Sequence, residues 1–288
     1  MIVKPRIKGF VCITAHPHGC FENVMDQISH AEKNPTMNMK KPKRVLVIGA
    51  STGYGLSSRI SASFSARAET LGVYFERPPK EDKPASAGFY NSLAFSKLAK
   101  DKGIATVDVN GDAFSDECKE EVIMKAKEMG QFDLIIYSLA SPRRTDPKDG
   151  NTYRACLKPI GSIYKNKTLD TDKEEIKEIV INPATEEEVY STERVMGGDD
   201  WCSWTEKLLE SDLLAPGCMN LAYSYIGPEV TRAIYRNGTI GKAKEHLEQS
   251  GRKLDTLLSE SVNGRSIVSV NKAVAVSYTH LRAHETRT

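Results

Sequence analysis

Three glycines lie close together in the sequence, at Gly49, Gly53 and Gly55, after the apolar run Val45–Ile48. Glycine lets the backbone approach a ligand closely, and the first turn of a helix offers free N–H groups and a positive dipole end. Such a loop, between a strand and a helix, is where a dinucleotide pyrophosphate binds in parallel α/β sheets. Because the spacing differs from G-x-G-x-x-G, the loop alone predicts this site only weakly.

A carboxylate follows the glycine loop at the spacing expected of a dinucleotide site. Glu76 comes 21 positions after Gly55, at the end of the next predicted strand. A carboxylate there accepts hydrogen bonds from the adenosine ribose and repels a 2′-phosphate. Together with the glycine loop, Glu76 predicts binding of NADH rather than NADPH.

The ends of two later predicted strands add weaker signals. Asp112 follows the third strand, where it would bond the adenine amino group of a cofactor or simply form a turn. The small residues of Ser138–Pro142 follow the fourth strand and would let a cofactor lie across its carboxyl end.

A tyrosine and a lysine lie nine positions apart, at Tyr235 and Lys244. A phenol near a nicotinamide can polarise a carbonyl or supply a proton, and an ammonium can hold the nicotinamide ribose and favour the phenolate. Gly238 and Gly241 would interrupt a helix, so the pair need not follow i, i+4 geometry. From residue types alone, a packed tyrosine beside a solvated lysine is the commoner arrangement.

Strand-like and helix-like stretches alternate through the middle of the sequence. This alternation predicts a doubly wound parallel α/β sheet of the Rossmann type, in a single domain over residues 1–276. A short hairpin is expected within residues 2–14, and residues 142–185 form an irregular polar insert. The predicted strands are 44–48, 71–75, 104–109, 134–139 and 266–276, and the predicted helices are 56–70, 96–102, 117–129, 187–195, 204–211 and 228–258.

Composition excludes several classes of protein. There are 40 Lys+Arg and 38 Asp+Glu, a net charge of +2, so the chain lacks the excess of basic charge that binding to nucleic acid or an anionic membrane would require. The run Val45–Ile48 is far shorter than the roughly 20 apolar residues of a spanning helix. The six cysteines include no C-x-x-C pair, and the first residues show no signal peptide, so we expect a cytoplasmic protein with reduced thiols. His16, His18 and Cys20 have metal-ligand types, but no second cluster accompanies them, so no metal is expected.

Taken together, the motifs resemble one family. It is the bacterial NADH-dependent trans-2-enoyl-CoA / enoyl-acyl-carrier-protein reductase family, a divergent branch of the short-chain dehydrogenases/reductases. The likeness runs from residue 1 to about residue 273 and includes the family's long Tyr–Lys spacing. The segments that carry it are Lys4–Phe10, Thr14–Pro17, Gly49–Gly55, Phe75–Pro78, Asn110–Asp116, Tyr137–Arg144, Met196–Trp201 and Tyr235–Lys244.

The resemblance implies a role for each matching residue. Tyr235 would be the proton donor, Tyr225 would contact the substrate thioester, and Lys244 would bind the nicotinamide ribose. The other cofactor residues divide by the part of NADH that they would contact. These are Gly49, Ala50, Ser51, Thr52, Gly53 and Tyr54 for the pyrophosphate, Phe75 and Glu76 for the adenosine, Asp112 and Ala113 for the adenine, and Leu139 and Ala140 for the central part.

The implied reaction is the 1,4-reduction of an enoyl-CoA or enoyl-acyl-carrier-protein substrate. Hydride goes from NADH to Cβ, tyrosine hydroxyls stabilise the enolate oxygen, and a proton reaches Cα. A carbonyl reductase on the same scaffold is an alternative, against which the long Tyr–Lys spacing stands. An NAD-binding fragment without catalysis is another. The oligomeric state is left open, with a monomer favoured, and Arg143 and Arg144 either meet substrate phosphates or form a solvated turn.

The C-terminal end of the sequence differs from the family. Residues 277–288 show no pattern that would complete a doubly wound sheet, and they resemble no part of the family. We therefore expect them to be a non-native tail that follows an incomplete reductase domain.

Overall fold

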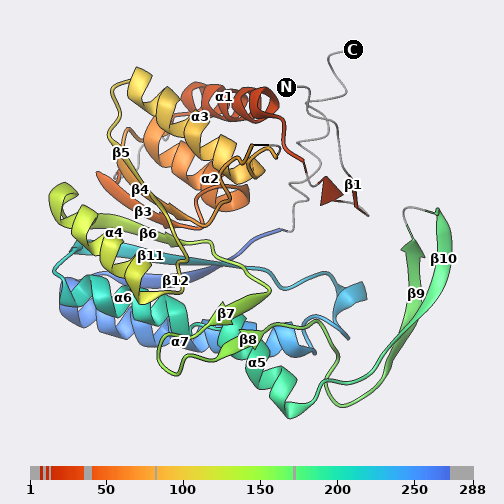
Figure 1. Ribbon diagram of the computed structural model, residues 1–288. Coiled ribbons are helices and arrows are strands. Elements are labelled where there is room, and N and C mark those ends of the chain that lie inside the picture. The colour runs from red at the N-terminus through yellow and green to blue at the C-terminus, as the bar shows by residue number, and fades with distance from the viewer. Residues whose placement is uncertain are drawn as a thin grey trace.

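A six-stranded parallel sheet forms the centre of the molecule in the computed structural model, which describes residues 7–8, 11–12, 14–35, 41–81, 83–170 and 173–272 (Figure 1). The strand order is β12-β11-β6-β3-β4-β5. The order reverses between β3 and β6, and ligands of doubly wound sheets bind outside the carboxyl ends of strands at such a point. The predicted fold class is confirmed. The strands are β3 (Arg44–Ile48), β4 (Glu69–Tyr74), β5 (Thr106–Asn110), β6 (Phe132–Tyr137), β11 (Leu214–Ser224) and β12 (Arg265–Val270).

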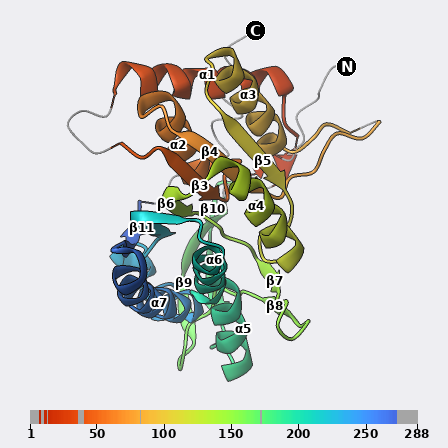
Figure 2. The same ribbon diagram turned by 90° about the vertical axis from the view of Figure 1, so that its left-hand side faces the viewer.

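Helices cover both faces of the sheet (Figure 2). On one face, Val24, Leu56 and Phe95 belong to a core built from α1 (Pro17–Lys33), α2 (Gly53–Ile60) and α3 (Ala87–Asp101). On the other face, Trp204 and Leu254 join a larger core with the sheet. The helices of that second face are α4 (Asp116–Met129), α6 (Asp199–Glu210) and α7 (Thr239–Val262), and α5 (Glu186–Met196) lies against α7.

Three predicted helices differ most from the structure. The helix predicted over 56–70 ends early: a π-helix covers Ser61–Ser65, Arg67 has φ of +64°, and β4 begins at Glu69. A residue with left-handed backbone dihedral angles cannot continue a right-handed helix. The helix predicted over 228–258 is a 3₁₀ turn and a series of further turns, and only from Thr239 is it α7. Helix α3 begins at Ala87, well before the predicted 96.

Strand β11 is absent from the prediction although it lies inside the sheet, between β6 and β12. Its sequence contains Pro216 and Gly217, and its pairing with β6 shifts register between Leu214 and Met219. Proline and glycine ordinarily argue against a central strand. The bulge accommodates them, so the local pattern was misleading.

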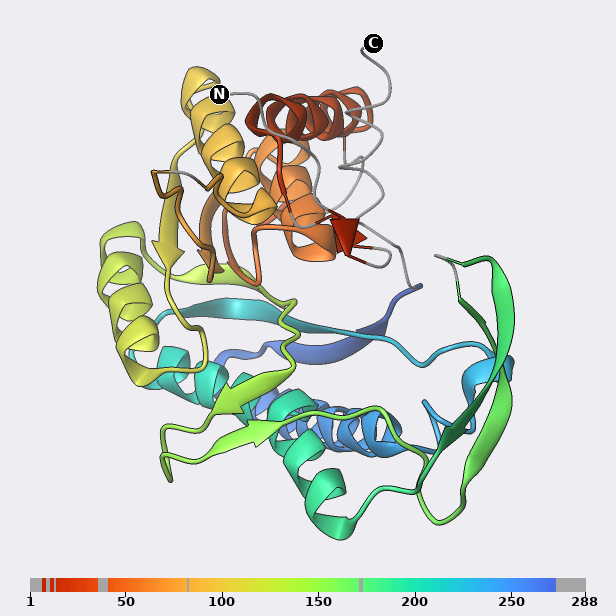
Figure 3. The ribbon, with the colours of Figure 1, turned by 45° about the vertical axis from the view of Figure 1, so that its right-hand side comes forward.

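The insert over residues 142–185 contains two antiparallel hairpins, so its prediction as irregular was wrong. Strand β7 (Arg143–Thr145) pairs with β8 (Thr152–Arg154), and β9 (Tyr164–Asp170) pairs with β10 (Glu175–Ile181). The β9–β10 hairpin extends away from the sheet (Figure 3). Most of its side chains are exposed on both faces, so no apolar alternation marks it in the sequence.

Near the N-terminus, the predicted hairpin is confirmed as β1 (Ile7–Lys8) and β2 (Val11–Cys12). At the other end, the strand predicted over 266–276 is β12, which ends at Val270. Its last positions and the predicted tail 277–288 lie outside the described residues. None of the helices in the described part of the chain is long and apolar enough to cross a membrane.

Candidate functional site

A cleft of about 780 Å³ opens at the carboxyl ends of β3, β4, β5 and β6. Of the predicted cofactor residues, it brings together Gly49, Ser51, Thr52, Gly53, Tyr54, Phe75, Glu76, Asp112, Ala113, Leu139 and Ala140. Ala50 is the exception in the glycine loop: its side chain is fully buried, and its N–H donates to the Val73 carbonyl at 2.9 Å. Ala50 therefore fixes the loop to β4.

The glycine loop lies directly against the end of β6. Gly49 has φ of +89°, and a Cβ there would be 2.2 Å from the Ser138 carbonyl oxygen. A Cβ at Gly55 would be 1.9 Å from the Gly49 carbonyl oxygen. Thr52 precedes α2 without a capping hydrogen bond from its side chain. Gly53 and Tyr54 of the first turn of α2 line the cleft, and the N–H groups of this turn lack a capping side chain, which leaves them available to a phosphate.

Glu76 is held in place on three sides. Its Oε1 accepts a hydrogen bond from Ser51 Oγ at 2.6 Å. The Asn110 side chain brackets its backbone, accepting from the Glu76 N–H at 2.8 Å and donating to the Glu76 carbonyl at 2.9 Å. A Cβ at Gly88 would lie 2.0 Å from Glu76 Oε1. Asn110 and Gly88 thus support Glu76, a role that the sequence analysis did not assign to either, because one contact is with the backbone and the other depends on the absence of a side chain.

The two interpretations of Asp112 are compatible. Asp112 Oδ1 accepts a hydrogen bond from the Phe114 N–H at 3.0 Å, which is a turn-forming contact, and Asp112 also lines the cleft.

The two arginines after β6 differ from each other. Arg143 is exposed and lines the cleft, whereas Arg144 is 3% exposed and pairs with Asp146 at 3.4 Å. The solvated alternative is therefore wrong for Arg144.

A second, smaller cavity of about 30 Å³ brings together Tyr225, Tyr235 and Lys244. The rings of Tyr225 and Tyr235 meet edge to face, with centroids 5.0 Å apart. Burial raises the pKa of Tyr235, and Tyr225 adds to the effect; burial lowers the pKa of Lys244. Tyr235 and Lys244 line the same cavity because Tyr235 lies in the turn before α7 and Lys244 in the first turns of that helix.

Two glycines let the chain pack closely where this turn meets the start of α7. A Cβ at Gly238 would lie 2.4 Å from the Ile234 carbonyl oxygen, and one at Gly241 would lie 1.8 Å from the Arg236 carbonyl oxygen. Tyr225 directly follows β11, the neighbour of β6. The two cavities thus lie at the same edge of the sheet, but the structure does not place Tyr225, Tyr235 or Lys244 among the residues that line the larger cleft.

The histidines near the N-terminus have structural contacts. His16 caps α1, with its Nδ1 accepting from the Gly19 N–H at 3.2 Å, and His18 lies 3.3 Å from Glu22. Within the described ranges, no group of three metal-ligating side chains comes together.

Comparison with known proteins identifies the family. The model for the NAD(P)H binding domain of trans-2-enoyl-CoA reductase matches residues 2–81, and the model for the trans-2-enoyl-CoA reductase catalytic region matches residues 83–280. A trans-2-enoyl-CoA reductase from Treponema denticola, solved in complex with NAD, is 50% identical with a TM-score of 0.91, over 96% of this chain and 69% of that one. The enzyme from Clostridium acetobutulicum, solved with NADH, is 40% identical with a TM-score of 0.90, over 98% and 73%.

Curated relatives agree with the solved structures. The enoyl-acyl-carrier-protein reductase (NADH) of Coxiella burnetii is 50% identical over 276 residues, which are 95% of this chain and 68% of the relative. The enzyme of the same name from Yersinia enterocolitica is 53% identical over 276 residues, 95% of this chain and 69% of the relative. The chain therefore belongs to the trans-2-enoyl-CoA reductase family, which includes the NADH-dependent enoyl-acyl-carrier-protein reductases.

Proposed function

We propose that this protein reduces the 2,3-double bond of trans-2-enoyl thioesters, with NADH as the hydride donor. The observation that carries the proposal is one edge of the sheet that holds both a glycine-lined cleft with a fixed carboxylate and the Tyr225–Tyr235–Lys244 cavity. The names of the relatives, which include enzymes for CoA and for carrier-protein thioesters, support both substrates.

The cleft fits a dinucleotide. The absence of a Cβ at Gly49 and Gly55 lets the loop pack tightly against the end of β6 and against itself. This packing keeps the loop in the wall of the cleft, where the first turn of α2 offers N–H groups to a pyrophosphate. Glu76 would accept from the ribose hydroxyls of the adenosine. Bound NADH would supply hydride to Cβ of the substrate.

The protein's own part in the reaction is to hold and protonate the enolate. Tyr225 and Tyr235 would donate hydrogen bonds to the thioester oxygen as negative charge develops there. The raised pKa of Tyr235 keeps its phenol protonated at neutral pH, so it has a proton to give. Lys244 would hold the ribose next to the nicotinamide.

One domain houses both parts in this proposal. Strands β3 and β4 come from the segment that matches the cofactor-binding model, and β5, β6, β11 and β12 from the segment that matches the catalytic model, yet all six share one sheet.

The cysteines that the structure describes are all free thiols: Cys20, Cys118, Cys156, Cys202 and Cys218. Free thiols support a place in the reducing cytoplasm.

The direct test follows NADH absorbance after addition of crotonyl-CoA. Oxidation of NADH with formation of butyryl-CoA is the expected result. Oxidation with simple ketones but not with crotonyl-CoA would favour the carbonyl reductase. Binding of NADH, seen by fluorescence, without turnover of either substrate would favour a binding protein.

Replacing Glu76 by glutamine is expected to weaken discrimination against NADPH. Glutamine keeps the contact with Ser51 but loses the charge that repels a 2′-phosphate, and like charges a few ångströms apart repel by more than about 1 kcal/mol near a protein surface. The ratio of kcat/KM for NADH to that for NADPH should fall by about tenfold or more. Glu81→Gln, outside the cleft, is the matched control. An unchanged ratio in Glu76→Gln would contradict the assignment.

Alkaline pH is expected to raise KM for NADH through Lys244. The charged ammonium is the binding form, and burial lowers its pKa below the ordinary 10.5. Its contribution is therefore complete below the lowered pKa and is lost as pH rises through it. Tyr235, Arg236, Glu245 and Glu248 line the same cavity.

The measurement compares KM for NADH against pH in two variants. Lys244→Arg keeps its charge, so the rise in KM should move to higher pH. Lys242→Arg, at an exposed site paired with Glu245, should leave the profile unchanged. Identical profiles for Lys244→Arg and the unaltered protein would rule out the assignment.

A further inference from the structure

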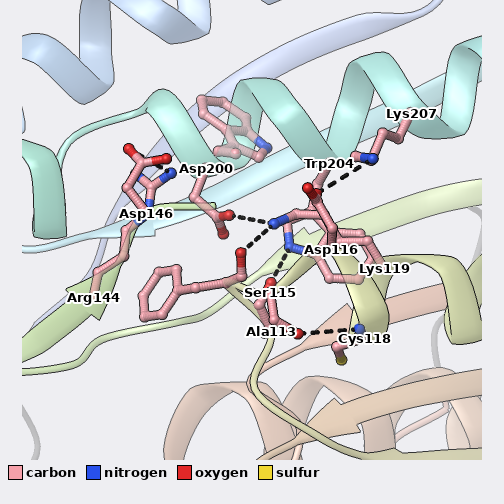
Figure 4. A network of polar contacts seen from close by, with 12 residues as sticks. Ala113, Ser115, Asp116, Cys118, Lys119, Arg144, Asp146, Asp200, Trp204 and Lys207 are labelled. Carbon is pink, nitrogen blue, oxygen red and sulfur yellow. Dashed lines mark hydrogen bonds and ion pairs between the residues drawn. The ribbon is translucent and has the colours of Figure 1, made fainter. Parts of the chain in front are cut away.

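A buried ion pair joins α4 to α6, next to residues that line the cleft (Figure 4). Lys119 of α4 and Asp200 of α6 are 2.8 Å apart, with side chains 0% and 2% exposed. Removing two charges from water costs several kcal/mol each, so a buried pair is seldom a source of net stability. The contacts that these two residues make with the cleft suggest another reason for their presence.

Lys119 and its neighbour Trp204 hold the adenine end of the cleft. Lys119 Nζ also donates to the Phe114 carbonyl at 2.9 Å, and Trp204 Nε1 donates to the Ala113 carbonyl at 3.0 Å. Ala113 and Phe114 both line the cleft, beside Asp112. The loop that would contact adenine is thus fastened by its backbone carbonyls to α4 and α6.

The other oxygen of Asp200 contacts the support of a second part of the cleft lining. Asp200 Oδ2 accepts a hydrogen bond from Tyr137 OH at 2.9 Å. Tyr137 ends β6, the next residues, Ser138–Ala140, line the cleft, and Ser138 and Leu139 lie against Gly49. One carboxylate therefore contacts supports of two separate parts of the cleft lining. Burial raises the pKa of Asp200, against which the Lys119 charge and the Tyr137 hydroxyl act, and burial keeps Tyr137 protonated.

We propose that Asp200 is a positioning residue for cofactor binding, which sets the adenine loop through Lys119 and the β6 end through Tyr137. Asp200 touches neither substrate nor cofactor; it acts by fixing the distance between these two parts of the cleft lining. The inference rests on the proposed function only in taking NADH as the ligand of the cleft.

The experiment measures binding separately from turnover in Asp200→Asn. Its matched control is Asp199→Asn, in the same first turn of α6, where the carboxylate pairs with Arg194 instead. Asparagine removes the charge opposite Lys119, so the dissociation constants for NADH and for AMP, which probes the adenine end alone, should both rise by about tenfold or more. At saturating NADH, kcat and the KM for crotonyl-CoA should change less than about twofold.

A purely structural role predicts a different pattern. It would lower Tm and the active fraction, hence kcat, with both dissociation constants unchanged, and that result would overturn the proposal. Asp199→Asn should keep both constants.

If Asp200→Asn does not fold, Tyr137→Phe tests the same proposal, because it removes only one hydroxyl. It should raise the dissociation constant for NADH and leave that for AMP unchanged. An unaltered constant for NADH, or an equal rise in both constants, would overturn the assignment of Lys119 and Tyr137 to different parts of the cleft. An unaltered chain that binds NADH but fails to reduce crotonyl-CoA would refute the proposed reaction alone, and the binding comparisons would still decide the role of Asp200.

Discussion

Tyr235→Phe is expected to lower kcat for crotonyl-CoA reduction by about 10²–10⁴-fold, the usual contribution of a positioned general acid. Phenylalanine keeps the edge-to-face contact with Tyr225 but has no proton to give. The dissociation constant for NADH should stay close to that of the unaltered protein, because the cleft is lined by other residues. Stopped-flow absorbance of NADH gives the rate, and fluorescence titration gives the binding.

The controls for this variant separate chemistry from packing. Tyr190→Phe removes a hydroxyl from an exposed ring that contacts Tyr153, so its kcat should be unchanged. Tyr225→Phe should cause a smaller loss than Tyr235→Phe, since it removes one hydrogen bond to the enolate but not the proton. Full activity in Tyr235→Phe would end its assignment as proton donor.

Gly49→Ala is expected to abolish NADH binding, with a rise in the dissociation constant of more than about 100-fold, equivalent to about 2.7 kcal/mol. The added methyl group would lie 2.2 Å from the Ser138 carbonyl oxygen, and this contact is with backbone that cannot rotate away. The loop or the end of β6 must therefore move, and both line the cleft.

Gly161→Ala is the matched control for this second variant. Gly161 has φ of +84°, close to the +89° of Gly49, but nothing lies within 4 Å of its Cβ position. Gly161→Ala thus has the same backbone strain without the collision, and it should bind NADH as the unaltered protein does. If both variants bind NADH normally, the close approach of Gly49 to β6 has no part in cofactor binding; if both lose it, backbone strain rather than space is responsible.

The sequence was most informative where one local pattern had one structural solution. Val45–Ile48 is an unbroken apolar run, which is typical of a strand buried on both faces, and all four residues are fully buried. The glycine loop connects this strand to α2, which begins at Gly53, as the sequence predicted. Glu76 lines the same cleft as the glycine loop because it lies just beyond the end of β4, next to β3 in the sheet.

Features that depend on distant partners could not be predicted. Lys119 and Asp200 are 81 positions apart, so no periodicity shows that their charges meet in the core. Asn220 is polar yet fully buried in β11, where its Oδ1 accepts from Trp201 Nε1 at 2.8 Å. A pattern of hydrophobicity excludes such a residue from a buried strand, although the partner satisfies it.

The Tyr–Lys cavity lies between these two cases. Gly238 correctly indicated a break in the predicted helix, since α7 begins at Thr239, but Gly241 lies inside α7 and does not interrupt it. The direction in which the chain turns back was not visible. It is set by backbone contacts, such as the Gly241 N–H that donates to the Tyr235 carbonyl at 2.9 Å. The resemblance to the family, rather than the residue types, singled out this pair.

The placement of the indole rings gives the protein an optical signal of its own. Trp201 and Trp204 are the two tryptophans of the chain, both lie on α6, and neither is more than 1% exposed. Buried indoles emit at short wavelengths, where a reduced nicotinamide absorbs. Because Trp204 donates to the carbonyl of Ala113, a cleft residue, quenching of its emission should track occupancy of the cleft without any added dye.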